Sequence, residues 1–70
     1  MEYTVEVNWD DEAEVWFAVC DDIPFATESD SFDSLMERIK TIAHDVLESN
    51  GKPTKDARLY VTAVRSESLA

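Results

Sequence analysis

Residues 32–49 carry the one long helical pattern in this sequence, and it limits the folds open to the chain. Apolar side chains recur there at intervals of three and four residues, so they share one stripe of a helix: Phe32, Leu35, Met36, Ile39, Ile42, Ala43, Val46 and Leu47. Ser31 is a typical N-cap, and Asn50-Gly51 is a typical helix stop. A single helix can cover only one face of the sheet that accompanies it.

Strand patterns surround this helix in the sequence. Residues 3–9, "YTVEVNW", alternate apolar and polar side chains with the period of two expected of a strand. Residues 57–64 show the same period, residues 14–20 form a denser strand pattern that is apolar on both sides, and a short strand is predicted at about residues 25–28. The polar "DDEAE" between the first two strands predicts a hairpin turn, and "DDIP" predicts the next turn.

The predicted order is therefore β-β-β-α-β, an α+β fold. Hairpin connections make the first three strands antiparallel neighbours, and the helix crossover returns the fourth strand parallel to one of them. Placing it beside the first strand gives a four-stranded sheet of order 3-2-1-4 with the helix on one face. Residues 1–70 form a single domain in this scheme, with a frayed tail from about residue 66.

The second strand is apolar on both sides. Trp16, Ala18 and Cys20 point one way, whereas Val15, Phe17 and Val19 point the other way. A strand of this kind lies in the centre of its sheet or reserves one face for a partner. Which set the helix covers stays open, because a one-residue shift in register exchanges the two sets. Either way, one apolar face has no covering element in the predicted fold.

The net charge of −10 is unevenly distributed along the chain. Residues 1–37 contain twelve acidic side chains and no Lys or Arg, while all six basic residues lie from Arg38 onward. An acidic half repels phosphate, which argues against direct binding of nucleic acid, and it favours encounter with a basic partner. The alternative, that the acids simply solubilise a small domain, stays open.

The cysteine content, the hydropathy pattern and the length of the chain restrict its chemistry, its location and its oligomeric state. The one cysteine, Cys20, excludes an intramolecular disulfide and a Cys-based zinc cage, and it is expected to pack as a small apolar side chain. The sequence shows no signal-peptide pattern and no apolar run of membrane-spanning length, which predicts a cytoplasmic protein without membrane contact. Because small domains often gain stability by self-association, a homodimer or higher oligomer is expected.

The segment "EVWFAVCDDIPFATESDSFDSLMERIKTIAHDVLE" resembles the HicB-like antitoxin family. Trp16 and Ala18 stand where that family has an aromatic and a small residue, and Asp22-Ile23-Pro24 matches its Asp-Leu-Pro turn. "SDSFDSLMERIK" is similar to its helix entry. The resemblance implies a stand-alone domain with a partial RNase H fold that neutralises a small basic, RNA-cleaving HicA-like toxin.

The chain departs from the family pattern in two places. Phe25 replaces the glycine that usually follows the proline of the turn. No helix-turn-helix pattern follows the fourth strand, so the operator binding typical of full HicB antitoxins is not expected here.

The RNase H resemblance raises a metal-dependent nuclease as a further hypothesis. Such chemistry needs carboxylates that converge on metal ions. Asp10, Asp11 and Glu12 lie at the hairpin tip, whereas Asp21 and Asp22 follow the second strand, about 17–20 Å away. "DDEAE" also lacks the glycine and the ligand spacing of a calcium loop. We therefore expect no metal site, no cofactor and no catalytic residues.

Two further side chains admit a structural and a functional interpretation. His44 lies on the polar helix face, four residues from both Lys40 and Glu48, and is expected to be a surface histidine and not a general base. Trp9 either fixes the hairpin by contact with Trp16 or Val15, or is exposed as an interface anchor. The structural role is favoured.

The sequence thus favours a non-enzymatic protein-interaction domain over two alternatives. These are a small homo-oligomeric structural domain with no toxin partner and, less favoured, the nuclease. The predicted partner-binding residues are acids for electrostatic steering and apolar side chains for contact: Asp10, Asp11, Glu12, Val15, Phe17, Val19, Asp21 and Asp22.

Overall fold

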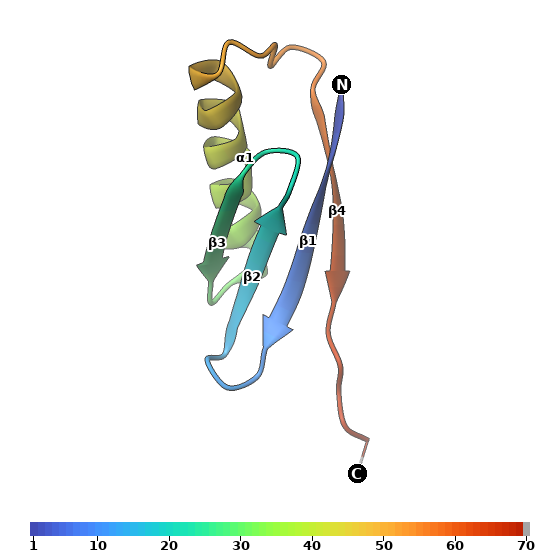
Figure 1. Cartoon of the computed structure of the whole chain (residues 1–70). Helices are drawn as coiled ribbons and strands as arrows, with labels where there is room; N and C mark the ends of the chain where they lie inside the picture. The colour runs from blue at the N-terminus through green and yellow to red at the C-terminus, as the bar shows by residue number, and fades with distance from the viewer. Residues whose placement is uncertain (70) are drawn as a thin grey trace.

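The computed structural model describes residues 1–69, and its elements follow the predicted order β-β-β-α-β (Figure 1). Strand β1 spans Glu2–Asp10, β2 spans Val15–Cys20 and β3 spans Phe25–Ser29. Helix α1 spans Phe32–Ser49 and is followed by strand β4, Arg58–Val64. Each element lies within a few residues of its predicted position.

The strands form one mixed sheet of order β3-β2-β1-β4, which confirms the predicted α+β topology. β1 pairs antiparallel with β2, and β2 pairs antiparallel with β3. β4 pairs parallel with β1, as a strand that returns from a helix crossover must. β3 and β4 are therefore the two edge strands, and β1 and β2 are central.

Local signals fix both ends of α1. The Ser31 side chain accepts a hydrogen bond from the Ser34 backbone N–H at 3.3 Å, which makes Ser31 the predicted N-cap. At the other end, Gly51 has φ of +67° and donates to the Glu48 carbonyl at 3.1 Å, while Lys52 donates to the Leu47 carbonyl at 2.8 Å. This pair of bonds is a Schellman motif, which ends the helix at the predicted stop signal.

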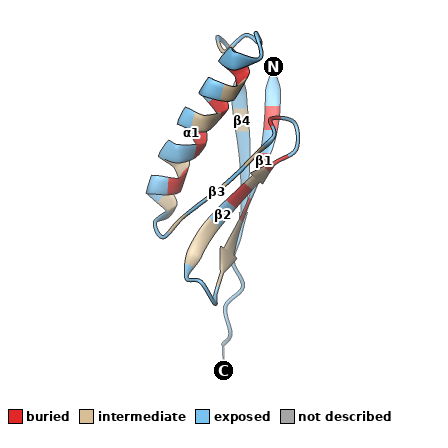
Figure 2. Cartoon of the chain, turned by 60° about the vertical axis from the view of Figure 1, so that its left-hand side comes forward, coloured by how far each residue is buried: buried red, intermediate tan, exposed pale blue. Residues whose placement is uncertain are grey.

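The core lies between α1 and one face of the sheet (Figure 2). The sheet contributes Tyr3, Val5, Val7, Ala18 and Cys20, and the helix and the turn before β3 add Leu35, Ile39, Ala43, Leu47 and Ile23. The helix thus covers the face that carries Ala18 and Cys20. Cys20 is buried as predicted, and its Sγ accepts a hydrogen bond from the Ile23 N–H at 3.3 Å.

Helix α1 lies over β3 and β2 and does not reach β4 (Figures 1 and 2). An open groove remains beside β4, where Ala43 and Leu47 of the helix face Ala57 and Leu59. Strand β4 is consequently exposed along most of its length, on both of its faces.

The end of the chain follows β4 without regular secondary structure. Residues 65–69 form neither helix nor strand, and the last residue of the predicted tail, residue 70, lies outside the described residues. Arg65 is nevertheless held in place, because its guanidinium stacks 4.2 Å from the centre of a Trp9 ring and its Nε lies 2.6 Å from the Glu67 carboxylate. Within the described chain, α1 lacks the length of apolar sequence that a membrane-crossing helix needs.

Candidate interaction surface

The face of the sheet opposite α1 carries an apolar strip along β2, formed by Val15, Phe17 and Val19. These side chains alternate with the buried Ala18 and Cys20, so they point away from the helix. Phe17 is 37% exposed, and the two valines are half-buried by their neighbours on the sheet. We call this side of the sheet the open face.

Polar side chains of β1 border the strip on one side. The antiparallel register sets Asp10 opposite Val15, Asn8 opposite Phe17 and Glu6 opposite Val19. The uncovered face predicted from the sequence is therefore present, but it is narrower than the pattern of β2 alone indicates. Between β1 and β3, the exposed apolar surface is the width of the single strand β2.

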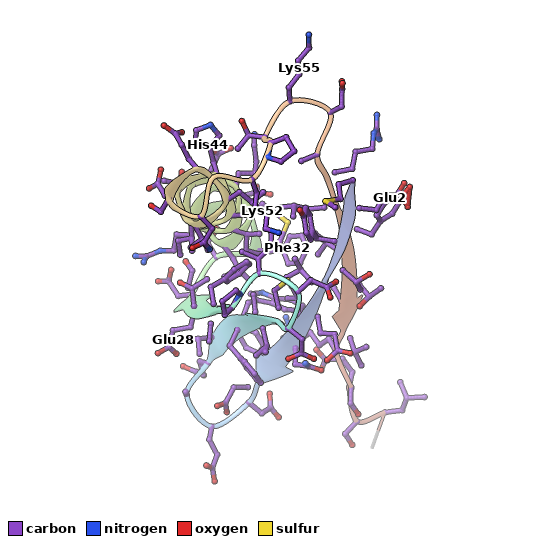
Figure 3. The ribbon with its side chains drawn as sticks, turned by 45° about the horizontal axis from the view of Figure 1, so that its top comes forward. Glu2, Glu28, Phe32, His44, Lys52 and Lys55 are labelled. Atoms are coloured by element: carbon purple, nitrogen blue, oxygen red, sulfur yellow. The ribbon has the colours of Figure 1, made fainter. Side chains whose placement is uncertain are left out.

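Strand β3 borders the strip on the other side, with Ala26 opposite Val19 and Glu28 opposite Phe17. Figure 3 shows Glu28 on the side of the sheet away from α1. Asp10, Phe17, Ala26 and Glu28 line a shallow hollow on this surface. Glu6 and Glu28 were not among the predicted site residues. Strand periodicity alone, applied to β1 and β3 as it was to β2, would have placed both of them on this face.

The acidic residues of the hairpin tip have structural contacts of their own. The Asp10 carboxylate accepts hydrogen bonds from the backbone N–H groups of Glu12 at 3.1 Å and Ala13 at 3.2 Å, as Asp commonly does in turns. The Asp11 carboxylate accepts the indole N–H of Trp9 at 2.8 Å. Glu12 projects from the exposed tip. Two of the three predicted steering acids at this end thus also stabilise the hairpin.

Asp21 and Asp22 lie at the opposite end of β2, in the turn that leads to β3, and both are exposed. Together with Glu6 and Val19 they line a second shallow hollow on the open face. The predicted separation of the acids into two groups at opposite ends of β2 is confirmed. The structure brings one group to each end of the apolar strip and does not bring the two groups together.

The separation of the acids also bears on catalysis. Among residues 1–69, no three His, Cys, Asp or Glu side chains lie close enough to hold a metal ion. His44 is exposed on α1, as predicted, with Nδ1 at 3.4 Å from a Glu48 carboxylate oxygen. In Figure 3 it lies on the side of the helix away from the sheet. It is far from the carboxylates of the open face, which lie across the sheet.

Trp9 has the structural role that the sequence favoured. It faces Trp16 across the hairpin with ring centres 5.2 Å apart in an edge-to-face arrangement, and Trp16 meets Phe32 at 5.1 Å in the same way. The three rings join the hairpin to the start of α1. Arg65 of the tail lies over the two tryptophan rings. The cluster is part of the helix side of the domain and not of the open face.

Comparisons with other proteins agree with this architecture. A family model described as a domain of unknown function, DUF1902, matches residues 2–69. The chain belongs to the DUF1902 family. The fold of this DUF1902 domain is similar to the crystal structure of hypothetical protein TTHA1013 from the extremely thermophilic bacterium Thermus thermophilus. The two share 28% identity and a TM-score of 0.72 over 100% of this chain and 99% of that one. No curated protein matches the sequence.

Proposed function

We propose that this DUF1902 domain is a non-enzymatic protein-interaction module that binds a small basic protein through its open face. The observation that supports the proposal is the strip of Val15, Phe17 and Val19, which no element of the described chain covers and which carboxylates border on both sides. An apolar strip inside an acidic rim suits a basic surface that also carries apolar side chains.

The two kinds of residue would contribute differently to binding. Contact with Phe17 removes apolar surface from water and slows dissociation, because a large side chain near the centre of an interface is a typical hot spot. Glu6, Glu28, Asp21 and Asp22 accelerate the encounter through long-range attraction, which salt weakens. Because the sequence resembles HicB-like antitoxins, the expected partner is a small RNA-cleaving toxin similar to HicA. The domain would then mask the basic surface that binds RNA.

The sequence leaves two other functions open. A homo-oligomeric structural domain with no toxin partner is favoured by one observation, the exposed edge strand β4. A metal-dependent nuclease gains nothing from the geometry, since the two groups of carboxylates lie at opposite ends of β2. The proposal and the structural alternative differ in whether the open face binds a second, different protein.

Co-purification from the native host, followed by mass spectrometry, tests the proposal. The expected result is a small basic protein in equimolar amount, whose binding to the purified domain is then measured at several salt concentrations. Phe17→Lys should weaken binding at least ~100-fold, because it removes an apolar contact and adds a positive charge that repels the basic partner. Thr41→Lys, which makes the same change of charge on the exposed surface of α1, is the control and should bind normally.

A second pair of variants isolates the steering. The double variant Asp21→Asn/Asp22→Asn should slow association and flatten its dependence on salt. Asp45→Asn/Glu48→Gln removes the same amount of charge from the exposed side of α1 and should have a smaller effect. Recovery of no basic protein, or tight binding by Phe17→Lys, would overturn the proposal.

A further inference from the structure

We infer that two copies of this domain associate through their β4 strands, which pair antiparallel about a two-fold axis at Val61. The inference stands independently of the basic partner, because it uses the edge of the sheet and not the open face. It rests on the backbone groups, the side chains and the charge of β4.

The free edge of β4 presents an unused set of hydrogen-bonding groups. The Arg58 N–H donates to the Met1 carbonyl at 2.9 Å, so Arg58 directs its backbone groups toward β1. Because these groups alternate along a strand, Tyr60, Thr62 and Val64 do the same. The backbone N–H and C=O groups of Leu59, Val61 and Ala63 therefore point outward from the sheet. Such a row is a template for another strand.

The other edge of the sheet lacks these properties. Strand β3 has five residues, contains Glu28 and is followed by Asp30, and α1 lies over it. Strand β4 has seven residues, contains no acid and is not reached by α1 (Figure 1). Short and charged edge strands resist association, whereas long apolar ones promote it. Apolar and aromatic side chains of β4 are also exposed: Tyr60 is 47% exposed, Val61 36% and Val64 64%. Strand β4 is therefore the edge at which association is expected.

Charge decides in favour of a second copy and against stacking of two open faces. Face-to-face contact would bring the acids of two N-terminal halves together, and the chain has a net charge of −10. Strand β4 has one charged residue, Arg58, and pairing about Val61 sets it opposite Val64 of the second copy. Identical charges do not meet across the two-fold axis in this arrangement.

The register about Val61 uses the whole strand, because Val61 is the middle residue of Arg58–Val64. Val61 pairs with Val61 of the second copy, and Leu59 pairs with Ala63 on each side of the axis. These are the residues whose backbone groups point outward, and in an antiparallel ladder each such pair exchanges two hydrogen bonds. Arg65 does not obstruct the edge, since it turns toward Trp9 on β1.

The two-fold axis also determines how the two open faces are arranged. Because the axis is perpendicular to the sheet, both open faces would lie on the same side of the joined sheet.

Size-exclusion chromatography with light scattering tests the inference on the full chain. The wild-type domain should elute with the mass of a dimer. Val61→Lys, which places two ammonium groups beside the axis, should elute as a folded monomer. Ala26→Lys makes the same change of charge on the other edge strand and should remain a dimer. A monomeric wild type, or a dimeric Val61→Lys variant, would overturn the inference.

Cysteine cross-linking tests the register and does not depend on the folding of a charged variant. Paired Val61 Cα atoms would lie about 5.5 Å apart, within the range that a disulfide spans, so Val61→Cys should cross-link under oxidation. Two Thr62 Cα atoms would lie about 8 Å apart, so Thr62→Cys should not. The native Cys20 is buried and does not compete. Equal cross-linking of both variants would exclude this register.

The two proposals can fail separately. Val61→Lys leaves the open face unchanged, so the variant should still bind the basic partner with the affinity of a single domain. Phe17→Lys leaves the β4 edge unchanged and should still form the dimer. If Phe17→Lys abolished the dimer, the open face and not the edge would join the copies, and the inference would be wrong.

Discussion

The two faces of the sheet are built from alternate residues of the same strands, yet one face is buried and the other is exposed to solvent. Val5 and Val7 of β1 are buried beneath α1, while Glu6 between them faces solvent. In β2 the alternation is apolar on both sides, with Cys20 buried and Phe17 exposed. A single helix can remove only one of these faces from water. Strand β2 therefore has more apolar surface than its own domain covers.

The largest loss of stability is expected for a substitution in the core, on the face of the sheet that α1 covers. Ile39 is buried against the sheet, so Ile39→Ala should lower the free energy of unfolding by about 2–5 kcal/mol, from lost burial and the cavity left behind. Ile42→Ala deletes the same atoms from a half-buried position of the same helix and should cost less. Urea unfolding at a fixed protein concentration measures both. Equal losses would show that α1 packs in a different orientation.

A pair of isosteric substitutions compares the faces directly. Val5→Thr buries a hydroxyl group in the core and should cost about 1–2 kcal/mol, because the group loses its hydrogen bonds to water. Val19→Thr makes the same change on the open face, where the hydroxyl stays near solvent, and should cost less than about 0.5 kcal/mol. The same urea titration checks them. A larger loss for Val19→Thr would mean that the open face is covered in solution.

The sequence predicted the elements because their signals are local. Ser31 and Gly51 define the ends of α1 through bonds to residues within four positions. Each strand is likewise visible in its own residues, by alternation in β1 and β4 and by a dense apolar run in β2. The order of the strands followed from connection rules that need no side-chain detail. The two acid groups could be separated for the same reason, since a hairpin fixes which ends meet.

What the sequence left open depends on contacts between elements. The choice between the Ala18 and Phe17 faces is a matter of one residue in register, which β2 cannot reveal because both of its sides are apolar. The position of α1 over β3 and β2, and the exposure of β4 that results, follow from how the helix packs on the sheet. The period of two places Glu6 and Glu28 on the open face, but only the cross-strand register shows that they lie opposite Val19 and Phe17.

A smaller effect is expected where the tail meets the aromatic cluster. Arg65→Ala removes the cation from the Trp9 ring and should lower the free energy of unfolding by about 0.5–1 kcal/mol, since the guanidinium is partly exposed. Arg38→Ala, on the exposed surface of α1, is the matched control and should have little effect. Tryptophan fluorescence in the native state should change for the first variant alone. An unchanged stability and spectrum for Arg65→Ala would show that the tail does not stay on the rings.

The smallest effect on stability should come from the residue with the largest effect on partner binding. Phe17→Lys leaves the four-carbon stem of lysine over the sheet and sets its ammonium group opposite Glu28, so the free energy of unfolding should change by less than about 0.5 kcal/mol. The measurement is urea unfolding beside Ile39→Ala under the same conditions. A loss of several kcal/mol would mean that Phe17 belongs to the structural core. A near-neutral result would show that its ring is not needed for folding, which leaves contact with another molecule as the reason for a phenylalanine on the open face.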